Sequence, residues 1–99
     1  MLTREQTIKV IIKLSTEILR EKDNKSYKLD SSTPLFGKNG VLDSLSLVRL
    51  ISDIEENYYH LTGKEIILAD EKAMSRSSSP FLTVDTLSDY ILHLQDNMK

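Results

Sequence analysis

The chain has 99 residues, the usual size of one domain, and its balance of 39% hydrophobic and 28% charged residues indicates a globular protein. It contains no cysteine, which excludes disulfides and thiolate metal sites. The net charge of −2 does not indicate nucleic-acid binding, and no apolar run is long enough for a membrane helix, so we expect a cytoplasmic protein that binds neither nucleic acid nor membrane.

The charges are unevenly distributed along the chain. Residues 1–42 hold eight basic and five acidic residues, whereas residues 43–99 hold five basic and ten acidic residues. The acidic second part favours basic partners, although a solvated acidic face without a partner would explain the same charges.

The first predicted helix covers about residues 3–21. Thr3 and Gln6 have the spacing of a capping box. Apolar residues then recur at helical spacing, namely Ile8, Ile11, Ile12, Ile18 and Leu19. A long connection over 22–43 follows, because Pro34 breaks a helix and Asn39-Gly40 is a turn signal. Its apolar residues are expected to anchor it to the core: Leu35, Phe36, Val41 and Leu42.

The second predicted helix, about residues 44–61, has the clearest pattern. Asp43 is a good N-cap and Gly63 is a plausible stop. Its core stripe is predicted to be Leu47, Leu50, Ile51, Ile54, Tyr58 and Leu61.

The last third of the chain predicts an extended apolar piece at 65–68, a short helix at 70–74 and a final helix at 84–96 after the N-cap Thr83. The expected fold is all-α. It is a small antiparallel bundle of three main helices plus one short helix, with a long first loop, forming a single domain over residues 1–99.

Ser44 stands at the first position of the second helix, where free backbone N–H groups and the macrodipole favour negative charge. A phosphate ester on its oxygen would suit that place. The plain alternative is that Ser44 is only a helix-start residue. Leu45 falls opposite the core stripe, and its place directly after the serine favours a contact role over chance exposure.

The stretch GVLDSLSLVRLISDIEENY (40–58) resembles the Asp-Ser-Leu signature and following helix of acyl carrier proteins. TPLFG (33–37) and the order of the elements extend the resemblance over the whole chain. It implies a carrier with no catalytic activity of its own. A phosphopantetheinyl transferase would attach 4′-phosphopantetheine to Ser44, with Asp43 helping to place magnesium, and an acyl group would ride as a thioester on the arm.

The resemblance also implies where partners and cargo would bind. Acyl-loading and acyl-transferring enzymes would meet the outer surface of the second helix, at Leu45, Val48, Arg49, Ser52, Glu55 and Glu56. Leu45 would contact either the arm or the partner. An acyl chain would find shelter among Ile51, Ile54, Ile66 and Leu68, which equally suit a packed core.

The pathway and cargo stay open. Arg49 and Ser52 stand where fatty-acid carriers usually have an acidic and an apolar residue. A dedicated carrier of a specialised acyl, polyketide or surface-glycan pathway is therefore at least as good an interpretation as fatty-acid synthesis. The alternatives are an aminoacyl or peptidyl carrier, and an unmodified helical interaction module. In each case we expect a monomer.

Other chemistry is poorly supported by the sequence. His60 and His93 lack a third matched ligand, so we expect surface histidines and no metal site. A hydrolase built on Ser44 and His60 would lack the G-x-S-x-G elbow and a sheet to support it.

Overall fold

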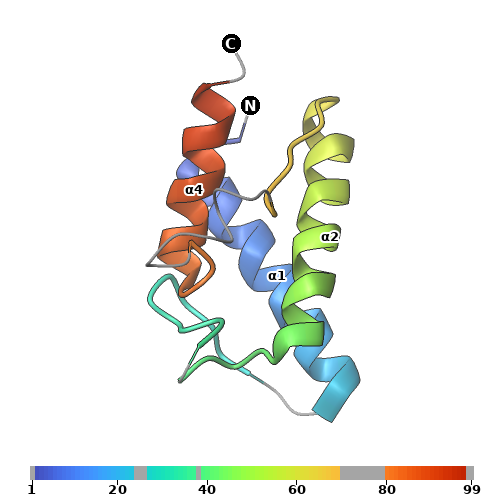
Figure 1. Ribbon diagram of the computed structural model, residues 1–99, viewed down its shortest axis with the longest axis vertical. Helices are drawn as coiled ribbons and strands as arrows, with labels where there is room; N and C mark the ends of the chain where they lie inside the picture. Colours follow the sequence, from blue (N-terminus) through green and yellow to red (C-terminus); the bar gives the residue numbers. More distant parts are fainter. Residues whose placement is uncertain (1, 24–26, 38, 70–79, 98–99) are drawn as a thin grey trace.

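The computed structural model describes residues 2–23, 27–37, 39–69 and 80–97, and these residues form three helices. They are α1 (Arg4–Asp23), α2 (Ser44–Thr62) and α4 (Val84–Asp96), shown in Figure 1. The described residues form no strand, and their single β-bridge joins Pro34 to Thr83. The prediction of an all-helical bundle is confirmed for the described residues. The predicted short helix at 70–74 lies outside the described residues.

The helix ends follow the local capping signals. The Thr3 N–H donates to Gln6 Oε1 at 2.9 Å, and the Gln6 N–H donates to Thr3 Oγ1 at 3.2 Å, which completes the predicted capping box. Asp43 and Thr83 cap α2 and α4, each accepting a bond from a backbone N–H of the first turn. Gly63 ends α2 in the left-handed conformation, with φ of 75°.

Helix α1 packs against both α2 and α4 and runs antiparallel to each of them (Figure 1). Helix α1 crosses the bundle obliquely. The N-terminal part of α1 lies behind α4, and the C-terminal part of α1 lies beside α2. Helices α2 and α4 point the same way, so the antiparallel prediction is wrong for that pair. The reason is the segment 64–69, which leads the chain back between the two helices before α4 begins.

The core forms one continuous cluster from all three helices and the segment 64–69. Leu50 of α2 and Leu87 of α4 are completely buried in it. At one end the buried amide of Gln95 ties the start of the chain to the bundle: it accepts from the Leu2 N–H at 2.8 Å and from the Tyr58 hydroxyl at 2.9 Å. Its own N–H donates back to the Leu2 carbonyl at 2.9 Å, so this buried polar group is well satisfied.

The connection before α2 is fixed against the start of α4 by backbone hydrogen bonds. The Leu35 N–H donates to the Leu82 carbonyl at 2.7 Å, and the Val84 N–H donates to the Thr33 carbonyl at 3.2 Å. The Leu42 N–H returns to the Leu35 carbonyl at 2.8 Å. Leu35 and Leu42 are both buried, as anchors should be, so the residues just before α2 have a defined position.

Leu61 corrects the predicted core stripe. Five of its six residues are buried, but Leu61 is 56% exposed although it lies on the same arc of the helix. The last turn of α2 extends past the region where the oblique α1 covers it (Figure 1). A helical pattern gives the direction of a side chain but not whether another element is present to cover it.

Candidate functional site

Ser44 is the first residue of α2 and is exposed to solvent. The first turn of the helix contains no acidic residue, so its free N–H groups and positive dipole end are balanced only from outside the helix. The N-cap, Asp43, places a carboxylate next to these N–H groups. The place is therefore electrostatically suited to an added negative group on the serine oxygen.

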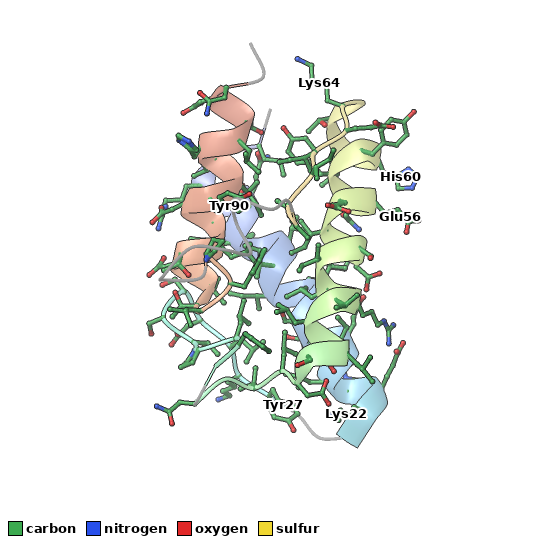
Figure 2. All side chains as sticks on the ribbon, in the orientation of Figure 1. Lys22, Tyr27, Glu56, His60, Lys64 and Tyr90 are labelled. Carbon is green, nitrogen blue, oxygen red and sulfur yellow. The ribbon has the colours of Figure 1, made fainter. Side chains whose placement is uncertain are left out.

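Both oxygens of Asp43 have partners. Oδ1 accepts the Ser46 N–H at 2.8 Å, and Oδ2 forms an ion pair with Lys22 Nζ near the end of α1. Figure 2 shows Lys22 at this lower end of the bundle, beside the start of α2. The hydrogen bond from Lys22, followed by the bond from the Ser46 N–H, holds the pKa of Asp43 well below its usual range.

A pH-dependent stability contribution is expected from Asp43. Because the pKa is lowered in the folded state, the charged form stabilises the fold above the unfolded pKa of about 3.9, and this contribution disappears as pH falls further. We expect the difference in melting temperature between wild type and Asp43→Asn to be larger at pH 7 than at pH 3. Asparagine also caps helices, so the comparison isolates the charge. Equal differences at the two pH values would contradict the role of the Lys22–Asp43 pair.

The outer face of α2, defined here as Leu45, Val48, Ser52, Glu56 and Tyr59, points away from the core. Leu45 is 83% exposed and Val48 is 61% exposed. Ser52 and Glu56 are exposed as well, and Figure 2 shows Glu56 projecting away from α1 and α4. Tyr59 is half-exposed and extends this face toward the end of the helix.

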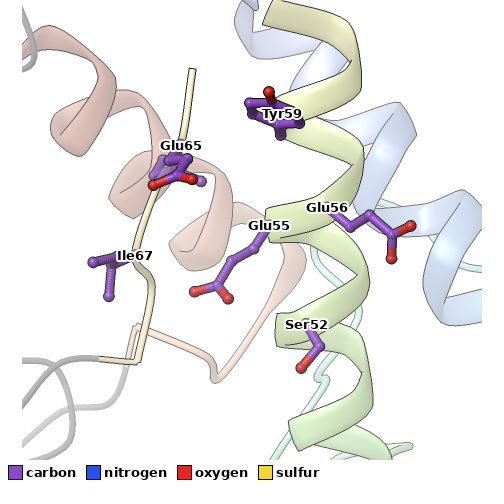
Figure 3. A pocket seen from close by; sticks show the side chains of 7 residues that line it. Ser52, Glu55, Glu56, Tyr59, Glu65 and Ile67 are labelled. Carbon is purple, nitrogen blue, oxygen red and sulfur yellow. The ribbon is translucent and has the colours of Figure 1, made fainter. Parts of the chain in front are cut away.

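Glu55 was predicted to lie with the other charged residues on the outer surface of α2, but its side chain lies elsewhere. It is half-buried, and its carboxylate accepts the Leu68 N–H at 2.9 Å. Figure 3 shows Glu55 pointing from α2 toward the segment that carries Ile67. On the other side, the Tyr90 hydroxyl donates to the Leu68 carbonyl at 3.1 Å. Glu55 therefore holds this segment in place and is less available to a partner.

Arg49 is exposed, but its guanidinium already has acidic neighbours. It pairs with Glu21 of α1, and its Nε lies 3.6 Å from the Asp53 carboxylate one turn further along α2. The bond from Arg49 lowers the pKa of Glu21 below its ordinary value. The residue thus links α1 to α2 at the edge of the outer face, where surface ion pairs contribute little stability.

The described residues line two surface hollows that adjoin α2. The first, of about 420 Å³, lies between α2 and the following segment (Figure 3) and is lined by Ser52, Glu55, Glu56, Tyr59, Glu65, Ile66 and Ile67. The second, of about 450 Å³, lies between α1 and the first turns of α2 and is lined by Ile18, Glu21, Lys22, Asp43, Leu45, Ser46 and Arg49.

The four residues predicted to shelter a cargo are all buried in the core: Ile51, Ile54, Ile66 and Leu68. They come from α2 and from the segment that lies between α2 and α4. Ile67 between them is 70% exposed, as expected where side chains of an extended segment alternate between its two sides. In the structure these four side chains are packed within the core. That they could shelter an acyl chain stays a prediction.

Within the described part of the chain, no three His, Cys, Asp or Glu side chains gather to hold a metal ion. None of its helices is long and apolar enough to cross a membrane. A scan against protein-family models gave no match, and searches of curated proteins and of solved structures gave none either.

Proposed function

We propose that this chain is an acyl carrier whose Ser44 is the attachment site of 4′-phosphopantetheine. The observation that carries the proposal is the exposed hydroxyl of Ser44 at the N-terminus of a helix whose outer face begins with an 83% exposed leucine. The Asp-Ser-Leu sequence at this point adds its resemblance to acyl carrier proteins. The finer fold, with a long first loop and a short third helix, belongs to the same proposal.

The chain's own residues suit this attachment. The Ser44 oxygen would attack the phosphorus of coenzyme A next to the pantetheine, the phosphoanhydride bond would break, and adenosine 3′,5′-bisphosphate would leave while a transferase accepts the serine proton. The resulting phosphodiester would lie at the positive end of α2, near the Lys22 ammonium that now pairs with Asp43. To help bind magnesium during transfer, Asp43 would exchange its bond with Lys22 for the ion.

The attached arm would supply the thiol that the sequence lacks, since the chain contains no cysteine. An acyl group would be held there as a thioester and presented to enzymes that contact the outer face of α2. Leu45 and Val48 would supply the apolar contact and Glu56 the charge. The chain itself would act as a monomer in the cytoplasm and catalyse no step.

Intact-mass measurement tests the proposal. Purified protein is incubated with coenzyme A, magnesium and a broad-specificity phosphopantetheinyl transferase. Wild type should gain the mass of one phosphopantetheinyl group, and Ser44→Ala should gain none while keeping its helical circular dichroism, because Ser44 lies outside the core. Ser52→Ala, which removes another exposed serine of α2, is the matched control and should be modified like wild type.

Two outcomes would reject the proposal. Absence of any mass gain in wild type would favour an unmodified helical interaction module. Full modification of Ser44→Ala would place the attachment elsewhere. Once the holo form exists, loading with fatty acyl, other acyl or aminoacyl groups separates an acyl carrier from an aminoacyl or peptidyl carrier.

A further inference from the structure

The hollow between α1 and α2 begins directly beside the proposed attachment site. Two of its lining residues, Asp43 and Leu45, are the immediate neighbours of Ser44 in the chain. From there it extends past Arg49 and along the last turns of α1, at Ile18 and Glu21. A group tethered to Ser44 would therefore reach it at high effective concentration.

We propose that this α1-side hollow holds the phosphopantetheine arm when the carrier is not engaged by a partner. The inference rests on the proposed modification of Ser44, and it names the surface of this chain on which the arm lies. In this state the arm folds over α1 rather than toward the segment 65–67.

Charge distinguishes the two hollows. The described lining of the α1-side hollow holds two carboxylates and two cations, in the pairs Lys22–Asp43 and Arg49–Glu21, so the charges of these residues balance. To bind the phosphodiester, Lys22 and Arg49 would exchange part of their present pairing with Asp43 and Glu21 for the phosphate oxygens. Among the residues that the structure describes, the other hollow is lined by three glutamates and by no basic residue, and these glutamates repel an anionic arm.

The α1-side hollow has both apolar and charged lining residues, which suits an arm that has both apolar carbons and amides. Ile18 is 3% exposed and forms an apolar floor, and Leu45 at the rim is 83% exposed. The dimethyl carbons of pantetheine would pack over this floor and cover part of the exposed Leu45 side chain, which removes apolar surface of Leu45 and of the arm from water. The amides of the arm would find hydrogen-bond partners in the charged side chains around the rim, the guanidinium of Arg49 among them.

Nuclear magnetic resonance of apo and holo protein tests the proposal. Residues 43–46 will shift through covalent attachment alone, so α1 decides. We expect clear amide shifts at Ile18, Glu21 and Lys22 on conversion to the holo form. Shifts restricted to 43–46, or found instead at Tyr59 and Ile67, would overturn the α1-side location while leaving the modification of Ser44 established by its mass. Without any mass gain, both proposals fail.

Disulfide trapping gives an independent readout, because the arm would carry the only thiol of the holo protein. Glu17→Cys places a second thiol on α1 near Arg49 without changing a lining residue, and Ser52→Cys places one in the other hollow as the matched control. With oxidised glutathione as oxidant, the intramolecular disulfide should form about tenfold faster in holo Glu17→Cys, because a lodged arm raises the local thiol concentration. Equal rates, or a faster reaction at residue 52, would contradict the proposal.

Discussion

Leu50→Ala is expected to destabilise the protein severely, whereas Leu45→Ala should leave its stability almost unchanged. Leu50 is completely buried and Leu45 is 83% exposed, although both belong to α2. Emptying a buried leucine site costs about 2–5 kcal/mol of unfolding free energy, and a surface substitution usually stays within about 0.5 kcal/mol. Thermal melts followed by circular dichroism should show a fall of about 8 °C or more for Leu50→Ala.

The same pair separates stability from recognition. Leu45→Ala should slow modification by the transferase, because it removes apolar contact area beside Ser44. Leu50→Ala should be modified normally at temperatures where it remains folded. If Leu45→Ala melts at as low a temperature as Leu50→Ala, Leu45 contributes to the core. If it melts normally and is modified at the wild-type rate, this exposed leucine has no part in the encounter with the transferase.

Gly40→Ala is the second substitution with a large expected effect. A Cβ atom on Gly40 would lie 2.5 Å from the Phe36 Cα and 2.6 Å from the Leu35 carbonyl oxygen, closer than real contacts allow. The backbone of Leu35 cannot move away easily, because it is bonded to Leu82 and Leu42. Overpacking of this kind costs about 1–3 kcal/mol, so the melting temperature should fall by several degrees.

Gly63 provides the matched comparison, because its constraint is conformational. It has φ of 75°, and a Cβ there would meet nothing within 4 Å. Alanine at this position should cost about 1 kcal/mol, and asparagine less, because asparagine tolerates the left-handed region. At residue 40 asparagine should be at least as harmful as alanine. Equal tolerance of asparagine at both sites would show that the loop around Gly40 relaxes and that close approach is not its constraint.

The sequence determined the features that depend on neighbours along the chain. The capping residues Thr3, Asp43 and Thr83 were predictable because a cap bonds to N–H groups two or three residues away. The buried stripe of α2 followed from its 3.6-residue period for five of six residues. The exposure of Leu45 followed from the same geometry, so the local setting of Ser44 is encoded in the residues next to it along the chain.

Only the tertiary structure decided what each element meets. Leu61 has the direction of a core residue but lacks cover, since α1 leaves α2 before the last turn. Glu55 turns to the Leu68 N–H because the chain returns between α2 and α4. The approach of Lys22 to Asp43 spans 21 residues, and no local pattern encodes it. Period and propensity fix the orientation of a side chain within its own helix, whereas its cover and its ionic partners depend on how the elements cross in space.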